Sequence, residues 1–156
     1  MEIKILKQME STPKLNGWVN KGLTIEEIQD LETLYNQGNL FPTALREFLF
    51  LAGNFPNIGF GLHDNIWRLQ QRAREGLADY ELEITRPFFA FDHLDSCSSF
   101  TLVYLDENQE DPDVYTATPY LIEDFGEPFI NRYKDYTFSS LVNEHIYRIK
   151  RGYALD

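Results

Sequence analysis

The sequence predicts an α+β fold in which a mostly antiparallel sheet packs against N-terminal helices and a C-terminal helix. Apolar residues recur at helical spacing in the first half of the chain and again at its end. Between these regions lie short aromatic or β-branched runs separated by polar turns. Because helices come first, then strands, then a helix, the order favours α+β over an alternating parallel fold.

Three helices are predicted in the first half, over about 24–38, 42–53 and 65–78. Thr24 and Glu27 form a capping box at the start of the first helix. Pro42 suits the first helical position of the second. Residues 57–62, between the second and third helices, fit either a short strand or a loop. The third helix is predicted to turn its arginines outward, namely Arg68, Arg72 and Arg74.

Three strands are predicted next, over about 88–92, 99–105 and 114–118. The polar stretch 106–113 is predicted to be a hairpin loop, which makes the last two strands antiparallel neighbours. Residues 120–136 give no assignable pattern. Thr137 is predicted to cap a closing helix, and His145 lies on its apolar stripe, where a hydrogen-bonded core histidine is the usual interpretation.

Composition favours one domain with an acidic surface. The chain has 156 residues without a repeat or a linker, so residues 1–156 are expected to form a single domain. Asp and Glu number 25 against 14 Lys and Arg, a net charge of −11. This charge argues against nucleic-acid binding, which needs clustered basic residues. It fits either a basic protein partner or the solubility that charge gives many proteins.

No export signal or membrane span is expected. Residues 1–9 lack the apolar core of about 7–15 residues found in secretory signals. No stretch approaches the ~20 apolar residues that cross a bilayer. Cys97 is the only cysteine, which excludes an internal disulfide. The protein is therefore expected to be cytoplasmic.

Few residues point to catalysis. Cys97 lies near His93, which would act as the base for a cysteine nucleophile, but a small residue in a turn is the simpler interpretation. No histidine pair or cysteine framework has metal-site spacing. We therefore expect no cofactor and no metal. An enzyme that uses Cys97 and His93 ranks behind a binding protein.

The densest acidic stretch is predicted to contact a partner. It does not fit an EF-hand, because Asp111 replaces the glycine and Ala117 the last glutamate. A basic surface would neutralise its carboxylates, whereas the alternative is a solvated loop. Trp67 and Tyr104 are candidate aromatic anchors, although either fits the core as well. The predicted contact residues are Asp106, Glu107, Glu110, Asp111, Asp113, Asp92, Asp95 and Trp67.

Several segments, taken in order, resemble the SUKH superfamily, a group that includes bacterial immunity proteins and a fungal cell-wall synthesis regulator. The resemblance covers about residues 20–150. It rests on segments 24–32, 40–42, 46–49, 53–54, 89–92, 113–115 and 138–142, which read TIEEIQDLE, LFP, REFL, GN, FAFD, DVY and FSSLV. The chain departs from the family pattern in the order of Gly53-Asn54, in lacking glycine over 94–99, and in a longer helix at 66–78.

The resemblance implies an α+β binding module without enzymatic activity. In bacteria it most often implies an immunity protein that neutralises a toxin of a polymorphic or contact-dependent system. A basic toxin, such as a nuclease, would suit the negative charge, which would speed association at low salt. A regulatory or scaffold role is the alternative. Neither nucleic acid nor a membrane is expected as a partner.

Overall fold

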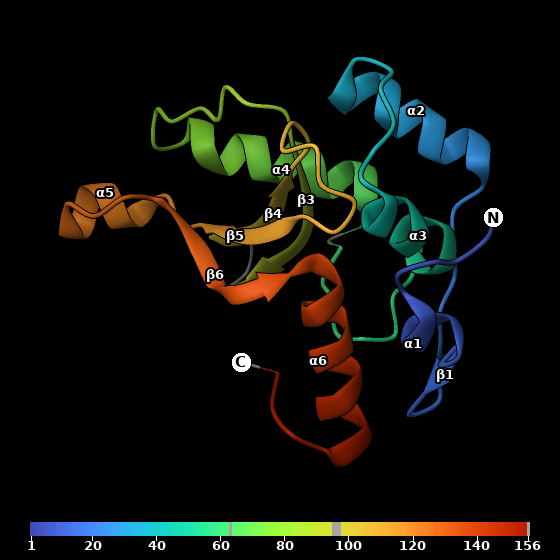
Figure 1. Ribbon diagram of the computed structural model, residues 1–156. Coiled ribbons are helices and arrows are strands. Elements are labelled where there is room, and N and C mark those ends of the chain that lie inside the picture. Colours follow the sequence, from blue (N-terminus) through green and yellow to red (C-terminus); the bar gives the residue numbers. More distant parts are fainter. Residues whose placement is uncertain (63, 95–97, 156) are drawn as a thin grey trace.

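The computed structural model describes residues 1–62, 64–94 and 98–155 (Figure 1). The described helices are α1 (Lys7–Glu10), α2 (Ile25–Asn36), α3 (Thr43–Ala52), α4 (Ile66–Ala78), α5 (Tyr120–Phe125) and α6 (Phe138–Arg151). The described strands are β1 (Lys14–Leu15), β2 (Trp18–Val19), β3 (Phe88–Leu94), β4 (Ser99–Tyr104), β5 (Asp113–Ala117) and β6 (Ile130–Thr137). This architecture confirms the predicted α+β class.

The last four strands form one antiparallel sheet in the order β3-β4-β5-β6, and β1 pairs with β2 in a separate hairpin. The connection between β4 and β5 is the predicted hairpin loop. The stretch that the sequence leaves unassigned forms α5 and most of β6. Residues 57–62, for which the sequence allows either a short strand or a loop, form a loop.

Local capping signals place the helix ends as predicted. Thr24 and Glu27 exchange the two hydrogen bonds of a capping box, at 3.1 and 3.0 Å. Thr137 caps α6, and its side chain accepts from the Ser140 N–H. Pro42 lies one position earlier than predicted. It is the N-cap of α3, because its ψ of 145° is extended and not helical.

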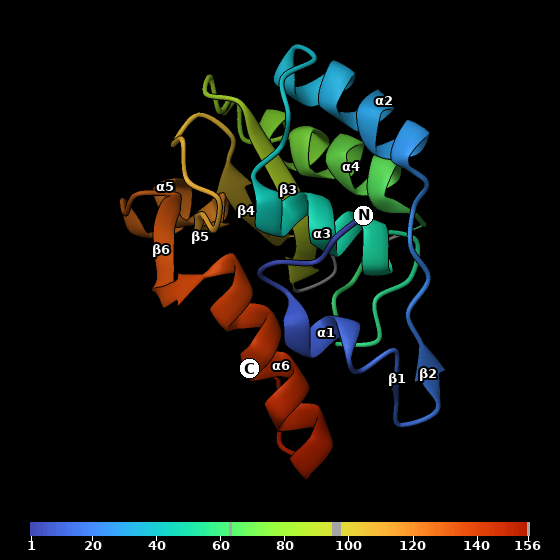
Figure 2. The same cartoon turned by 45° about the vertical axis from the view of Figure 1, so that its right-hand side comes forward.

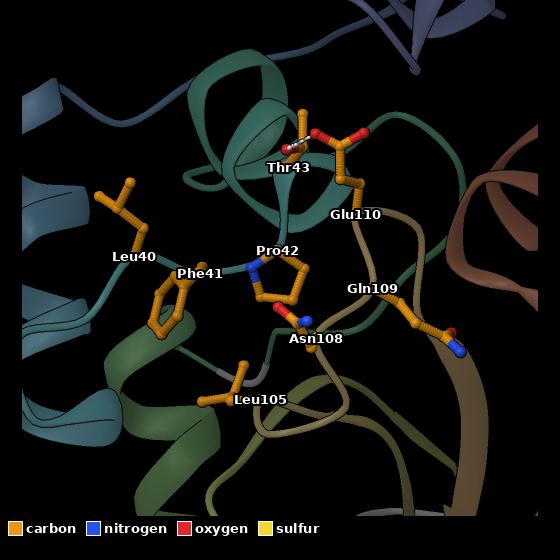
Figure 3. A pocket seen from close by; sticks show the side chains of 8 residues that line it. All are labelled: Leu40, Phe41, Pro42, Thr43, Leu105, Asn108, Gln109 and Glu110. Atoms are coloured by element: carbon orange, nitrogen blue, oxygen red, sulfur yellow. Dashed lines mark hydrogen bonds between the residues drawn. The ribbon is translucent and has the colours of Figure 1, made fainter.

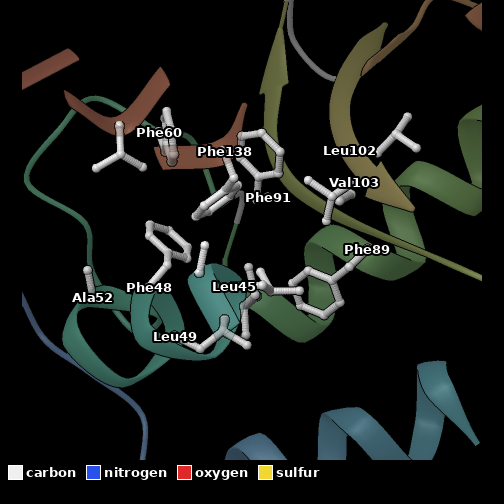
Figure 4. Packing of buried hydrophobic residues seen from close by; sticks show 14 of the residues in the cluster. Leu45, Phe48, Leu49, Ala52, Phe60, Phe89, Phe91, Leu102, Val103 and Phe138 are labelled. Carbon is white, nitrogen blue, oxygen red and sulfur yellow. The ribbon is translucent and has the colours of Figure 1, made fainter. Parts of the chain in front are cut away.

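Aromatic rings join α3, α6 and the sheet in the centre of the core (Figure 4). Phe138 of α6 meets Phe48 of α3 and Phe91 of β3 edge-on, with ring centroids 5.4 and 4.9 Å apart. Phe60, from the 57–62 loop, lies 5.3 Å from Phe91. Edge-to-face packing adds attraction beyond the burial of area, so these rings fix α6 against the sheet.

Helix α4 covers the outer edge of β3. Gln70 is fully buried; it accepts the Ala90 N–H at 2.9 Å and donates to the Ala90 carbonyl at 2.6 Å, as a neighbouring strand would. A covered edge cannot pair with another chain. The long helix that departs from the SUKH pattern therefore completes the sheet.

The prediction that all three α4 arginines point outward is wrong for Arg74. Its guanidinium lies 4.7 Å from the ring centroid of Tyr35 and 4.2 Å from that of Phe88. Burial between these rings lowers the pKa of Arg74. Arg68 and Arg72 do lie outward, where both pair with Glu75. The reason is packing: Arg74 closes the gap between α2, α4 and β3.

Two titratable side chains hold the 57–62 loop between α6 and β3. His145 is buried, and its Nδ1 lies 2.7 Å from the Ile58 carbonyl. A carbonyl only accepts, so Nδ1 carries the proton. From the other side, Asp92 accepts the Gly61 N–H at 2.6 Å. The sequence-based interpretation of His145 as a hydrogen-bonded core histidine is confirmed.

We expect His145→Gln to lower the free energy of unfolding by about 1–3 kcal/mol, because the Ile58 carbonyl loses its buried donor. Burial lowers the pKa of His145, so its contribution is present above about pH 6.5 and is lost as the pH falls. The difference in unfolding free energy between the wild type and the variant, measured in urea from about pH 8 to 5, should therefore shrink as the pH falls, because titrations that the two proteins share cancel. A difference that stays constant over this range would contradict this account.

Candidate protein-binding surfaces

The first two carboxylates of the β4–β5 loop, Asp106 and Glu107, belong to a network with one arginine and two tyrosines. Arg86 lies 2.6 Å from Asp106 and 3.8 Å from Glu107, and its guanidinium stacks 3.7 Å from the ring centroid of Tyr104. The hydrogen bond from Arg86 lowers the pKa of Asp106. Glu107 also accepts from the hydroxyl of Tyr115, at 3.2 Å. These carboxylates already have a cationic partner.

The other three carboxylates of the loop tie neighbouring elements together. Asp111 accepts the Ser139 N–H at 2.8 Å and its hydroxyl at 2.6 Å, at the start of α6. Asp113 pairs with Arg132 of β6 at 3.2 Å. Glu110 accepts from the Thr43 hydroxyl at 3.3 Å (Figure 3). The loop is thus more engaged with the fold than a solvated turn.

A hollow of about 210 Å³ lies between this loop and the start of α3 (Figure 3). Leu40 and Asn108 line it, and they also line an adjoining hollow of about 410 Å³ beside Asp106. Leu40 is 69% exposed. The predicted residues Asp106 and Glu110 therefore border a real groove, but the loop carboxylates already have partners within the chain.

We expect the double change Glu110→Lys/Asp111→Lys to lower the free energy of unfolding by about 1–3 kcal/mol. The lysine at 111 cannot accept from Ser139, and it brings a positive charge to the N-terminus of α6. Glu110→Lys alone is the control, since the Glu110 main-chain carbonyl keeps its bond to the Ala44 N–H. Equal stability of the single and double variants in urea unfolding would contradict the capping role of Asp111.

The remaining predicted contact residues do not join this loop. Asp92 is only 7% exposed, because a bulge between Ala90 and Asp92 shifts the strand register and its carboxyl binds Gly61. It lies at the opposite end of β3 from Phe88, which pairs with Tyr104 next to the loop. Burial therefore contradicts the use of Asp92 as a surface contact. Asp95 lies outside the described residues.

The two aromatic candidates lie mainly in the core. Trp67 of α4 is half-buried and packs against the core cluster, two helical turns before Arg74. Tyr104 is buried beneath Arg86. Of the cysteine–histidine pair, His93 is half-buried at the end of β3, against Gly61. Cys97 lies outside the described residues, so the geometry of that pair stays untested.

A second acidic surface, which sequence reasoning missed, combines α5 with the segment that follows α4 (Figure 1). We call it the α5 surface. None of its six carboxylates forms an ion pair with another residue in the described parts of the chain. They are Asp79, Glu81, Glu83, Glu123, Asp124 and Glu127, and its apolar members are Tyr80, Leu82, Ile122 and Phe125.

The α5 surface exposes much apolar area. Phe125 is 64% exposed, Ile122 43% and Tyr80 39%, and no residue of α5 is buried. A hollow of about 170 Å³ separates Tyr80 and Leu82 from Ile122. Small-molecule sites usually enclose about 300–1,000 Å³, so this hollow suits a single side chain of another protein better than a free ligand.

The α5 surface has a signal in the sequence. Residues 79–85 and 120–128 each carry three carboxylates with apolar residues and contain no Lys or Arg. What the sequence does not show is that these two segments, about 40 residues apart, meet across one hollow.

No protein-family model matches the sequence, and it matches neither a curated protein nor a solved structure. Over residues 1–62, 64–94 and 98–155, no helix has both the length and the apolar character required to cross a membrane. Within the same ranges, no group of three or more His, Cys, Asp or Glu side chains is arranged to hold a metal ion.

Proposed function

We propose that this chain is a non-enzymatic protein-binding module that neutralises a basic partner. The role we favour is that of an immunity protein against a toxin, such as a nuclease, of a polymorphic or contact-dependent system. The observation that carries the proposal is the α5 surface, which combines exposed Ile122 and Phe125 with six carboxylates that form no ion pair among the described residues.

Two independent features support this role. The net charge of −11 would steer a basic protein toward the chain and accelerate their encounter at low salt. The resemblance to the SUKH superfamily points to the same class of function. A nuclease toxin is a fitting partner because its own site must attract phosphates and is therefore basic.

Co-expression with the product of the adjacent gene tests the proposal. We expect the two proteins to purify as a complex, and we expect the chain to restore growth to cells that produce that partner. A complex without rescue would favour the regulatory or scaffold role. If the two proteins form no complex and growth is not restored, the immunity role is refuted.

The alternative enzyme role of Cys97 and His93 has a separate test. Because Cys97 is the only cysteine, a thiol reagent reports on it alone. We expect its rate at neutral pH to match that of an ordinary thiol. An activated thiolate, which reacts far faster, would favour the enzyme over the binding module.

A further inference from the structure

We propose that the α5 surface is the docking site for a basic polypeptide segment that inserts one bulky apolar side chain into the hollow between Tyr80 and Ile122. This inference rests on the proposed function as a protein-binding module but not on the identity of the toxin. It assigns the interface to a place other than the β4–β5 loop, which carries the densest charge in the sequence.

Both walls of the hollow are held by hydrogen bonds at helix ends. After α4, the Leu82 N–H donates to the Leu77 carbonyl and the Glu81 N–H to that of Ala78, both at 2.9 Å. After α5, the Glu127 N–H donates to Leu121 at 3.1 Å and the Gly126 N–H to Ile122 at 3.0 Å. The pair after α4 is a Schellman motif, whereas the Gly126 bond after α5 is that of the simpler αL motif; Glu81 and Gly126 lie in the left-handed region. The hollow is thus formed before a partner arrives, which lowers the entropic cost of binding.

The wall after α4 alternates between buried and exposed positions. Leu82 and Ile84 are half-buried and pack toward the core, whereas Glu81 and Glu83 are exposed. Of the exposed carboxylates, Glu123 lines the apolar hollow, whereas Glu83 borders a separate hollow together with Arg74 and Arg86. An occupant therefore meets charge and apolar surface together, as in the polar rim and apolar centre of protein interfaces.

Charge complementarity decides the occupant. The six carboxylates of the α5 surface have no ion pair within the described chain, so a second copy of the chain would bring like charges together. A basic segment reverses this repulsion. The β4–β5 loop differs, since Arg86, Arg132 and the start of α6 already engage its carboxylates. Exposed Phe125 and Ile122 would supply the apolar contact that electrostatic attraction alone lacks.

The test uses a synthetic peptide of six lysines around one tryptophan, blocked at both ends, and the whole ¹⁵N-labelled protein at ~20 mM salt, where screening is weak. We expect amide shift changes to concentrate in residues 79–84 and 120–127. A peptide with alanine in place of tryptophan should bind several-fold more weakly. A peptide with glutamates in place of lysines should not bind.

The matched variants reverse the same number of charges at two places. Glu123→Lys/Asp124→Lys should weaken binding by at least about tenfold. Glu26→Lys/Asp30→Lys, on the exposed face of α2, should have a much smaller effect, because it changes only the net charge. Phe125→Ala should weaken binding of the tryptophan peptide more than that of the alanine peptide.

Absence of binding would overturn the inference, as would shifts spread over the whole acidic surface or equal effects of the two double variants. Equal binding of the tryptophan and alanine peptides would also overturn it, because the hollow would then be unused. The proposed function fails separately. If the adjacent gene product binds the Glu123→Lys/Asp124→Lys variant as tightly as the control, the docking site is wrong and the function stands. If the peptide docks as expected but no toxin is neutralised, the docking site stands and the proposed immunity function is wrong.

Discussion

Glu47→Ala is expected to lower the free energy of unfolding by about 3–6 kcal/mol. Glu47 of α3 is 1% exposed, and its carboxyl group accepts the N–H groups of Lys4, Ile5 and Leu6 at 2.9, 2.9 and 2.8 Å. Helix α1 has no side-chain cap, and Glu47, about 40 positions away, instead binds the three amides that lead into it. A buried N–H left without an acceptor costs about 1–3 kcal/mol. The bond to Leu6 is buried, and those to Lys4 and Ile5 are half-buried.

Release of the N-terminal segment sets an upper limit on this loss. Ile3, Leu6 and Met9 are buried, and α1 lies beside α6 (Figure 2). Detachment would expose all three side chains, at about 1.5–3 kcal/mol each. The Glu47→Ala variant therefore either keeps its N-terminal segment packed, with the amides of residues 4–6 left without acceptors, or releases residues 1–10. It adopts whichever of the two states costs less free energy.

Denaturant unfolding and hydrogen exchange of the Lys4–Leu6 amides measure the effect. Glu10→Ala, an exposed change within α1, is the matched control. Glu47→Gln should fall between the two, because Oε1, which serves Ile5 and Leu6, remains an acceptor. Equal stability of Glu47→Ala and Glu10→Ala would show that the buried carboxyl group does not hold the N-terminus.

The sequence predicts the elements whose signals are local. The capping residues of α2 and α6 and the apolar stripes of the longer helices act within a few positions, and so does the alternation of polar turns with apolar strands. Helix α5 lacks such a stripe, since none of its residues is buried, and β6 has no regular alternation of burial. The N-terminal elements are too short for periodicity and depend on Glu47.

The candidate site was harder to predict, because the availability of a charge depends on contacts distant in sequence. The β4–β5 loop has the higher local density of carboxylates, but Arg86, Arg132 and Ser139 reach it from other elements. The α5 surface consists of two weaker acidic segments that only the fold brings together. The number of carboxylates in a stretch of sequence therefore does not show how many of them remain unpaired and accessible to a partner.

Asp92→Asn is expected to remove a pH dependence of stability worth about 4 kcal/mol between pH 4 and 8. Burial raises the pKa of Asp92 to about 7 from an ordinary value of 3.8, against the smaller opposing effect of the bonds from the Gly61 and His93 backbone. Over this interval the folded state holds a proton that the unfolded state has released. The stabilisation is therefore complete below about pH 3.8 and is lost as the pH rises to about 7.

Asparagine has nearly the shape of the protonated carboxyl group, keeps an acceptor for the Gly61 N–H and does not ionise. The variant should therefore differ little from the wild type near pH 4 and be more stable by up to about 4 kcal/mol at pH 8. The quantity to measure is the difference in unfolding free energy between the two proteins at each pH, in which the titration of His145 cancels. Asp30→Asn, which makes the same change in charge on the exposed face of α2, is the matched control. A difference for Asp92→Asn that stays constant across the range would mean that the bulge in β3 leaves this carboxyl group as easily ionised as one in water.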